Sequence, residues 1–339
     1  MTLPTRILKI PQNLSLINAV AFCNHLHLFF PTERLILDCK VVQHIEPFTI
    51  AYVSSVLKKY TEDHPSIVVE FRNYGPSYAA HMGFYKAAGL NFGNDPGEAR
   101  GSQNYIPLTI IKVGDIEREA AESYEHVGNI IEKESSRLAE MLIRDNDGEL
   151  FDTLTYSLRE IMRNVVEHSD SEVLEICAQY WPTKNKVEIA VLDSGSGVKK
   201  SLSNNPFLKI ENDRDAIHLA LMPAVSGKMF KGVKKRTNDA WQNSGFGLYM
   251  TNRIARNGGS FFLSSGSYGL LLSAQGKRDM NMIFNGTALR MVIDTTRTGN
   301  LSSSLARYRS EGYAIAKQYD KDSPIEPSLA STMLFRDFN

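Results

Sequence analysis

The sequence is poor in cysteine and has no excess of either charge. Its three cysteines, Cys23, Cys39 and Cys177, lie far apart, so no pair has the spacing of metal ligands. We expect buried thiols in a reducing compartment. Lysine plus arginine and aspartate plus glutamate number 38 each. A chain with balanced charge gives no reason to expect direct binding to nucleic acid or to a membrane surface.

Long hydrophobic runs are also missing. No stretch reaches the roughly 18 uninterrupted apolar residues of a membrane-spanning helix. The first residues, MTLPTRILKIPQN, have neither the basic flank nor the apolar segment of a signal peptide. These absences predict a soluble, cytoplasmic protein. At roughly 100–200 residues per domain, a chain of 339 residues favours two domains.

Strand and helix patterns alternate in the first part of the chain, residues 1–92, and this order favours a small α/β sheet with helices packed on it. The predicted strands are Arg6–Ile10, Arg34–Asp38 and Ser66–Arg72, and the predicted helices are Leu14–Phe30, Phe48–Tyr60 and Tyr78–Ala88. Residues 91–105 are rich in glycine, asparagine and proline, which is typical of a loop or linker.

The second part of the chain begins with helical patterns and ends with strands. The predicted helices are Asp115–Arg144, 148–168, Arg214–Leu221, Gly247–Arg256 and Leu301–Lys317. The predicted strands are Val173–Tyr180, Lys186–Leu192, Ser260–Ser265, Gly269–Ser273 and Ala288–Ile293, after a short apolar run at Tyr105–Val113. The helix at 301–317 carries no functional pattern.

A polar face follows the apolar stripe of the helix at 148–168. Glu160, Asn164 and His168 are four residues apart, so their side chains project from one face. A carboxamide oxygen suits Mg²⁺, which keeps several waters and accepts phosphate oxygens as further ligands. A carboxylate one turn earlier can hold or deprotonate a water. A solvated helix face explains the three residues equally simply.

Three further short patterns follow. A buried strand ends at Asp193, and Gly195 and Gly197 follow it, so a fixed carboxylate lies beside flexible backbone. The sequence SGFGL, residues 244–248, opens a helix, where free N–H groups can bind phosphate. A Gly-Thr pair ending at Thr287 precedes the last strand. Each pattern alone is also explained by an ordinary turn.

The order of these patterns resembles the GHKL superfamily of ATPases (gyrase, heat-shock chaperone, histidine kinase, MutL). The resemblance covers E-x-x-x-N-x-x-x-H, D-x-G-x-G, a polar lid, G-x-G-L, the hairpin segment NGGSFFLSSG and G-T, over residues 119–295. It implies a C-terminal Bergerat-type α/β sandwich, a mixed four- or five-stranded sheet with helices on one face, and ATP with Mg²⁺ as ligands.

The resemblance also assigns roles to the polar residues. It implies that Asn164 holds magnesium and that Glu160 activates the attacking water. It implies that Asp193 accepts a hydrogen bond from the adenine amino group, with Thr287 assisting. His168 occupies a position that would contact phosphate, although a histidine that simply ends a helix is an equal alternative.

The glycines complete the site that the resemblance implies. Gly195 and Gly197 would line the base, and Gly245, Gly247 and Leu248 would close on the phosphates. In the lid between the glycine patterns, the basic residues either form a solvated face or fold onto the γ-phosphate. These residues are Lys228, Lys231, Lys234, Lys235 and Arg236.

Residues 1–95 resemble a STAS domain, the fold of anti-sigma-factor antagonists. The match lies in RLILDCKVVQHIEPFTIAYVSSVLKKY, SIVVEFR and KAAGL. In that family a serine after the strand-end aspartate can be phosphorylated, but here Pro47 or Phe48 takes its place, and Thr49 is the nearest hydroxyl. His126 is followed by Val127 instead of an acidic residue, which favours a surface histidine over a phosphoacceptor.

These observations predict a STAS-like domain at 1–95, a linker at 96–118, the ATP-binding domain at 119–295 and a tail of unknown role at 296–339. The first hypothesis is a nucleotide-dependent regulatory switch with slow ATP hydrolysis, acting on a protein partner or within a homodimer. A serine/threonine kinase of the anti-sigma-factor type is the second. A scaffold that senses ATP without hydrolysing it is the third.

Overall fold

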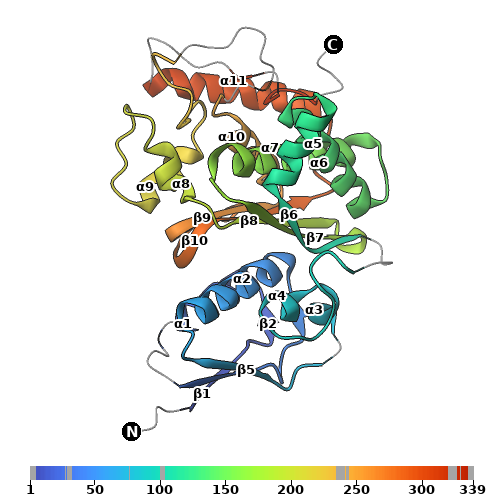
Figure 1. The fold of residues 1–339 in the computed structure, drawn as a ribbon. Coiled ribbons are helices and arrows are strands. Elements are labelled where there is room, and N and C mark those ends of the chain that lie inside the picture. Colours follow the sequence, from blue (N-terminus) through green and yellow to red (C-terminus); the bar gives the residue numbers. More distant parts are fainter. Residues whose placement is uncertain are drawn as a thin grey trace.

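The fold is a mixed α/β architecture with several sheets, as predicted (Figure 1). The computed structural model describes residues 5–26, 28, 33–75, 77–99, 104–233, 241, 244–319, 327–328 and 330–334. Within these ranges, no helix is both long enough and apolar enough to cross a membrane.

The N-terminal part contains a small parallel sheet in the order β1-β3-β5, beside a two-stranded ribbon of β2 and β4. Its strands are β1 (Thr5–Lys9), β2 (Asn13–Leu14), β3 (Arg34–Asp38), β4 (His44–Ile45) and β5 (Val68–Arg72), and its helices are α1 (Leu16–Leu26), α2 (Pro47–Asp63), α3 (Tyr78–His81) and α4 (Phe84–Ala87). The single helix predicted at 78–88 is two short helices, because Gly83 between them adopts a left-handed φ of 88°.

A five-stranded sheet in the order β6-β7-β8-β10-β9 forms the centre of the molecule. Its strands are β6 (Tyr105–Lys112), β7 (Val173–Trp181), β8 (Lys186–Asp193), β9 (Ser260–Ser273) and β10 (Gly276–Asp294). Each pairing is antiparallel, whereas we expected a mixed sheet. Short turns join β7 to β8 and β9 to β10, and a short turn imposes antiparallel pairing. The edge strand β6 lies within the range that we assigned to a linker; the domain boundaries themselves stay predictions.

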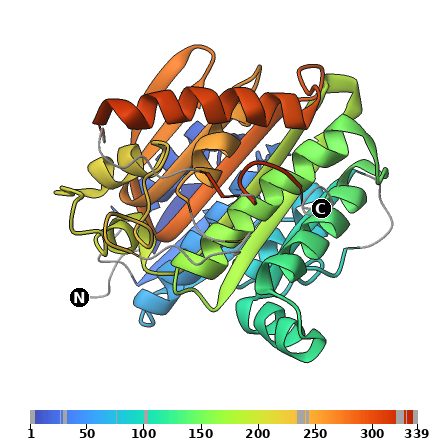
Figure 2. The ribbon, with the colours of Figure 1, turned by 90° about the horizontal axis from the view of Figure 1, so that it is seen from above.

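Helices cover one face of this sheet (Figure 2). They are α5 (Val113–Ser123), α6 (Val127–Ile143), α7 (Gly148–His168), α8 (Gly197–Leu202), α9 (Asp213–Ala220), α10 (Gly247–Ala255) and α11 (Leu301–Tyr319). The single helix predicted at 115–144 is wrong, because the chain turns at Tyr124, whose φ is 56°. The turn lets Ile116 and Leu138 pack into the same core, which a straight helix of about 45 Å would not allow.

The opposite face of the sheet is buried too, against α2 and α1 of the N-terminal part (Figure 1). On β8, Ala190 and Leu192 face the N-terminal helices, while Ile189 and Val191 face the helical layer. This two-residue period is the normal alternation of a strand. Our expectation of helices on one face was therefore incomplete, because helices pack against both faces of this sheet.

Four charged residues meet where α2 packs on this face, and we call them the rear cluster: Glu46, Lys186, Glu188 and Arg290. Glu188 and Arg290 are buried, and Glu46 and Lys186 are partly exposed. The Arg290 Nη2 atom lies 2.7 Å from Glu188 Oε2 and 3.2 Å from Glu46 Oε2. The backbone N–H of Phe48, in the first turn of α2, donates to Glu188 Oε1 at 3.2 Å. The start of α2 is thus tied to the middle of β8.

Candidate functional site

An open cavity lies between α7, the end of β8 and the start of α10. Clefts with a largely apolar lining and a few polar groups are the usual form of small-molecule and cofactor sites. Among the residues that line it are all the predicted site residues except Gly195: Glu160, Asn164, His168, Asp193, Gly197, Gly245, Gly247, Leu248 and Thr287. Segments that are far apart in the sequence therefore meet around one hollow.

Asp193 is the acidic group at the sheet end of the cavity. It ends β8, opposite Thr287 of β10 in the antiparallel register, and is only 5% exposed. Burial raises the pKa of Asp193 to about 6, although hydrogen bonds from the backbone N–H of Gly195 and from Thr287 lower it. The Gly195 N–H lies 2.9 Å from Asp193 Oδ1. At neutral pH the Asp193 carboxylate is a fixed hydrogen-bond acceptor that is largely shielded from solvent, and these two hydrogen bonds use only part of its lone pairs.

The two glycines after Asp193 differ in position. Gly197 lines the cavity and has a φ of 76°, and a Cβ there would lie 2.7 Å from Ser265 Oγ. Gly195 does not line the cavity; a Cβ on it would overlap the Ser169 carbonyl oxygen. Because Gly195 has no side chain, the loop can pass close to the end of α7. Glycine is therefore needed at this position for packing.

The polar face of α7 turns toward the cavity, as its spacing predicted. The carboxylate of Glu160 is 3% exposed, and its Oε1 accepts from Arg159 Nε at 3.1 Å and from Arg163 Nη1 at 3.5 Å. One turn later, the amide Nδ2 of Asn164 is buried and has no hydrogen-bond partner among the described residues. Burial lowers the pKa of His168 to about 3, helped by Lys228 and Arg163, so its imidazole is neutral at pH 7.

The second glycine pattern forms the opposite wall. Gly245 has a φ of 70°, and a Cβ on it would overlap the backbone of Val225. Gly247 is the first residue of α10, and a Cβ there would overlap Glu160 Oε2. The first N–H groups of a helix have no partner within it, and the helix dipole favours an anion there. This wall therefore suits a phosphate group beside the Glu160 carboxylate.

The donor set limits how a metal could bind. Among the described residues, no three His, Cys, Asp or Glu side chains form a metal-binding group. Mg²⁺ does not need such a group, because phosphate oxygens and waters supply most of its ligands. The carboxamide of Asn164 lines the cavity, and its oxygen is the kind of atom that would serve as the single protein ligand of an ion carried in with a phosphate.

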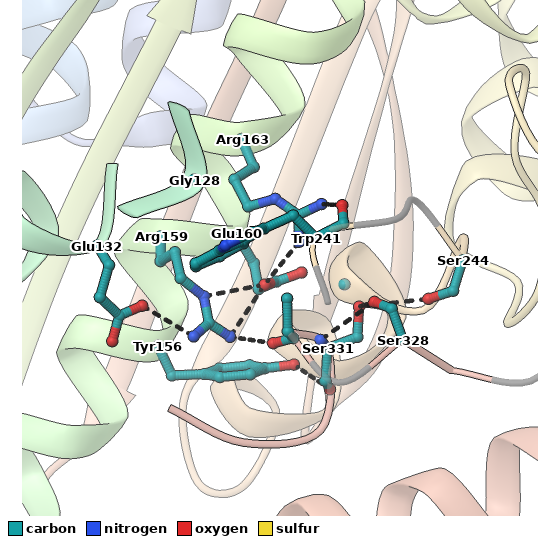
Figure 3. Close-up of polar contacts among 12 residues, drawn as sticks. Gly128, Glu132, Tyr156, Arg159, Glu160, Arg163, Trp241, Ser244, Ser328 and Ser331 are labelled. Carbon is teal, nitrogen blue, oxygen red and sulfur yellow. Dashed lines mark hydrogen bonds and ion pairs between the residues drawn. The ribbon is translucent and has the colours of Figure 1, made fainter. Parts of the chain in front are cut away.

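Glu160 is surrounded by charged and aromatic residues that the sequence did not predict as part of the site (Figure 3). We call the charged residues of this group the front cluster: Glu132, Arg159, Glu160 and Arg163. Arg159 has no exposed surface, and its Nη1 lies 2.8 Å from Glu132 Oε2. Ser331, from the C-terminal tail, also lines the cavity. The arginines are visible in LREIMRN, but no pattern links them to a tail 170 residues away.

The basic residues predicted in the lid are described only in part. Lys228 donates to the backbone carbonyl of Glu167, and Lys231 is exposed. Lys234, Lys235 and Arg236 lie outside the described residues. Nearby, Val225, Ser226 and Gly227 line the cavity, so part of the polar segment between the glycine patterns forms its wall.

The two phosphoacceptor candidates occupy structural positions. Thr49 is fully buried, and its hydroxyl donates to the carbonyls of Leu14 and Glu46, both at 2.8 Å. His126 caps α6; its Nδ1 accepts from the Gly128 N–H at 3.0 Å, and its ring stacks on Trp241 with centroids 6.0 Å apart. Thr49 is thus closed off from a phosphate donor, whereas His126 is an exposed histidine, as predicted, whose Nδ1 is used by the helix cap.

Comparisons with known proteins do not add to this geometry. No protein-family model matches the chain, and no curated protein matches it either. The resemblance to GHKL and STAS proteins therefore depends on the residues and spacings described above.

Proposed function

We propose that the chain binds ATP with Mg²⁺ in this cavity and acts as a nucleotide-dependent regulatory switch. One observation carries the proposal: four short patterns, chosen from the sequence for nucleotide chemistry, converge on one cavity. Unrelated turns and helix faces would have no reason to meet. The order of the patterns resembles that of GHKL ATPases, which bind ATP in this way.

The adenine end of the proposed site is the sheet end. A buried carboxylate that already accepts from Gly195 and Thr287 has further lone pairs for the adenine amino group. Gly197 lines the cavity beside Asp193, and its missing side chain lets Ser265 Oγ approach the backbone there. Asp193 is therefore the group that we expect to select adenine.

The phosphate end is the start of α10. Its free N–H groups face a triphosphate, Asn164 supplies a ligand to the accompanying Mg²⁺, and His168 offers a neutral hydrogen bond. Glu160 is the residue placed to take a proton from an attacking water. The described residues 225–227 belong to the predicted lid and line this end of the cavity, so nucleotide binding would change their contacts, which is the proposed switch.

Calorimetry with ATP, ADP and a non-hydrolysable analogue, with and without Mg²⁺, tests the proposal directly. The informative variant is Asp193→Asn, which keeps the shape but adds donors where an acceptor is needed. Its matched control is Asp115→Asn, the same change on the exposed surface of α5. We expect wild type and the control to bind and Asp193→Asn to lose at least tenfold in affinity. If all three proteins fail to bind adenine nucleotides, the proposal is wrong.

Turnover separates the remaining hypotheses. Phosphate release that disappears in Glu160→Ala favours a hydrolysing switch, whereas tight binding without release favours a sensing scaffold. A kinase would transfer labelled phosphate to a protein hydroxyl. Because Thr49 is buried, the acceptor would have to lie elsewhere, and a chain that labels no candidate partner is not a kinase of the anti-sigma-factor type.

A further inference from the structure

The C-terminal tail makes its contacts at the nucleotide cavity (Figure 3). Ala330, Ser331 and Leu334 are each no more than 3% exposed. The Tyr156 hydroxyl donates to the Ser331 carbonyl at 2.8 Å, and Ser331 Oγ lies 3.3 Å from Ser244 Oγ, one residue before Gly245. The tail therefore touches α7 and the proposed phosphate loop at once.

Arg159 connects this tail to Glu160. Its guanidinium donates to the Glu160 carboxylate at 3.1 Å, to the Met333 carbonyl at 3.1 Å and to the carbonyl of Ala330. A planar guanidinium has five N–H donors in a fixed fork, so acceptors at one end fix the direction of the other. The position of the tail thereby sets how Arg159 engages Glu160.

Aromatic rings close the remaining sides of the guanidinium. Its central carbon lies 4.9 Å from the Tyr156 ring centroid and 5.7 Å from the Trp241 ring centroid. Ion pairs gain strength when water is excluded. With the tail in place, Arg159 is fully buried, and its attraction for Glu160 is at its strongest.

We propose that Arg159 is a positioning residue for Glu160 and that the docked tail, residues 330–334, restrains ATP hydrolysis through it. The inference depends on the proposed function. In hydrolysis, the water oxygen bonds to the γ-phosphorus, the bond to the β–γ bridging oxygen breaks with its electron pair leaving on ADP, and a carboxylate takes the water's proton. Arg159 and Arg163 both donate to Glu160 Oε1, and while the tail is docked these contacts fix the carboxylate and reduce its ability to accept that proton.

Release of the tail has the opposite effect. Without the carbonyls of Ala330 and Met333, the guanidinium loses two acceptors and becomes accessible to water, and its hold on Glu160 weakens. Hydrolysis then becomes faster, while the groups proposed to bind adenine and phosphate stay in place. The expected signature is a change in kcat without a change in the affinity for ATP.

Two full-length variants release the tail by different routes. Leu334→Ala removes a buried anchor that packs with Phe246 and Met250 in one apolar core, and Tyr156→Phe removes the hydrogen bond to Ser331. Leu305→Ala is the matched control, because it makes the same truncation in the same core from α11. Hydrogen exchange at residues 330–334 verifies that the first two loosen the tail and the control does not.

We expect kcat for ATP hydrolysis to rise about 3–10-fold in Leu334→Ala and Tyr156→Phe, with KM unchanged, and to stay at the wild-type value in Leu305→Ala. Arg159→Lys should raise kcat to the same extent, and adding Leu334→Ala to it should give no further increase. A tail that loosens while kcat stays constant or falls overturns the inference and leaves ATP binding intact. A failure of wild type to bind ATP at all overturns the proposed function, and the inference with it.

Discussion

The rear cluster and the front cluster each combine two acidic and two basic side chains around a buried ion pair, yet different elements of the chain complete them. In the rear cluster, the groups that satisfy Glu188 are Arg290, Lys186 and the Phe48 N–H, all on the sheet or the start of α2. In the front cluster, the tail contributes acceptors to Arg159, and Arg163 Nη2 donates to the Trp241 carbonyl at 2.7 Å. The rear cluster therefore links α2 of the N-terminal part to the five-stranded sheet. The front cluster instead takes partners from the tail and from Trp241, so it can lose them when the tail leaves.

The charge state of the rear cluster supports this distinction. Burial alone would raise the pKa of Glu188, but Arg290 and Lys186 hold it below the usual value, so the carboxylate stays ionised. Glu188 is ionised and has no exposed surface, so the loss of any partner leaves a buried charge that water cannot reach. The rear cluster is therefore the place where the loss of one side chain should cost most.

The largest effect is expected for Arg290→Met. Glu188 would keep its charge with fewer partners, which costs about 3–5 kcal/mol for a buried ion pair broken on one side. Urea unfolding measures the loss. The double variant Glu188→Gln, Arg290→Met removes the charge as well and should recover most of it. A loss below about 1 kcal/mol in the single variant would show that the rear cluster does not join the two parts.

Asp193→Asn should stabilise the fold while it removes nucleotide binding. The pKa of Asp193 is about 6 in the fold, against about 3.9 in an unfolded chain. The fold therefore holds the proton more tightly, and wild type loses stability as pH rises from about 4 to 6. The variant escapes this loss and should gain up to about 3 kcal/mol above pH 6 and nothing below pH 4. Unfolding at both pH values tests the sign.

The same pKa predicts how nucleotide affinity depends on pH. A carboxylate accepts a hydrogen bond from the adenine amino group more strongly than a protonated carboxyl does, so affinity should fall as pH is lowered through about 6. Calorimetry at pH 5 and pH 7.5 measures the change. A wild-type affinity that is equal at the two values would remove Asp193 from adenine recognition.

A third variant, Gly247→Ala, acts on the front cluster through a steric effect. The added methyl group would overlap Glu160 Oε2 and push the whole carboxylate away from Arg159 and Arg163. We expect this to lower the free energy of unfolding by about 1–3 kcal/mol. Gly114→Ala is the control, because a Cβ there meets no described atom within 4 Å. It should change stability by less than about 1 kcal/mol. Equal effects of the two substitutions would contradict the close approach at Gly247.

The smallest effect is expected for Lys133→Ala. Its ion pair with Glu125 is largely exposed, and such pairs contribute about 0–1 kcal/mol. Adding 0.5 M salt should reduce even this difference. A larger, salt-independent loss would mean that exposed and buried pairs on this chain do not differ as we describe.

The sequence predicted local elements better than their partners. Helix α7 begins and ends as expected, because its apolar stripe, the turn before Gly148 and its polar face agree. The turn at Tyr124 was missed, since a left-handed non-glycine residue leaves no mark in the apolar pattern. The D-x-G-x-G pattern marks Gly195 as a position of interest. Only the structure shows why glycine is needed there, because a side chain would overlap Ser169.

Long-range placement explains most of what could not be predicted. The packing of α2 on the rear face, and of the tail on Arg159, depends on complementary surfaces between distant segments. Neither has a period or a motif. The cavity could be anticipated because each of its walls carries its own local pattern.

The register between β8 and β10 restricts which mutations this chain can accept. Asp193 faces Thr287 across the same ladder that places Ala190 opposite Arg290. Because side chains alternate along a strand, inserting a single residue into the middle of β8 would either swing Glu188 to the helical side or move Asp193 away from Thr287, depending on which half of the strand shifts. This pair of strands therefore accepts substitutions more readily than changes of length.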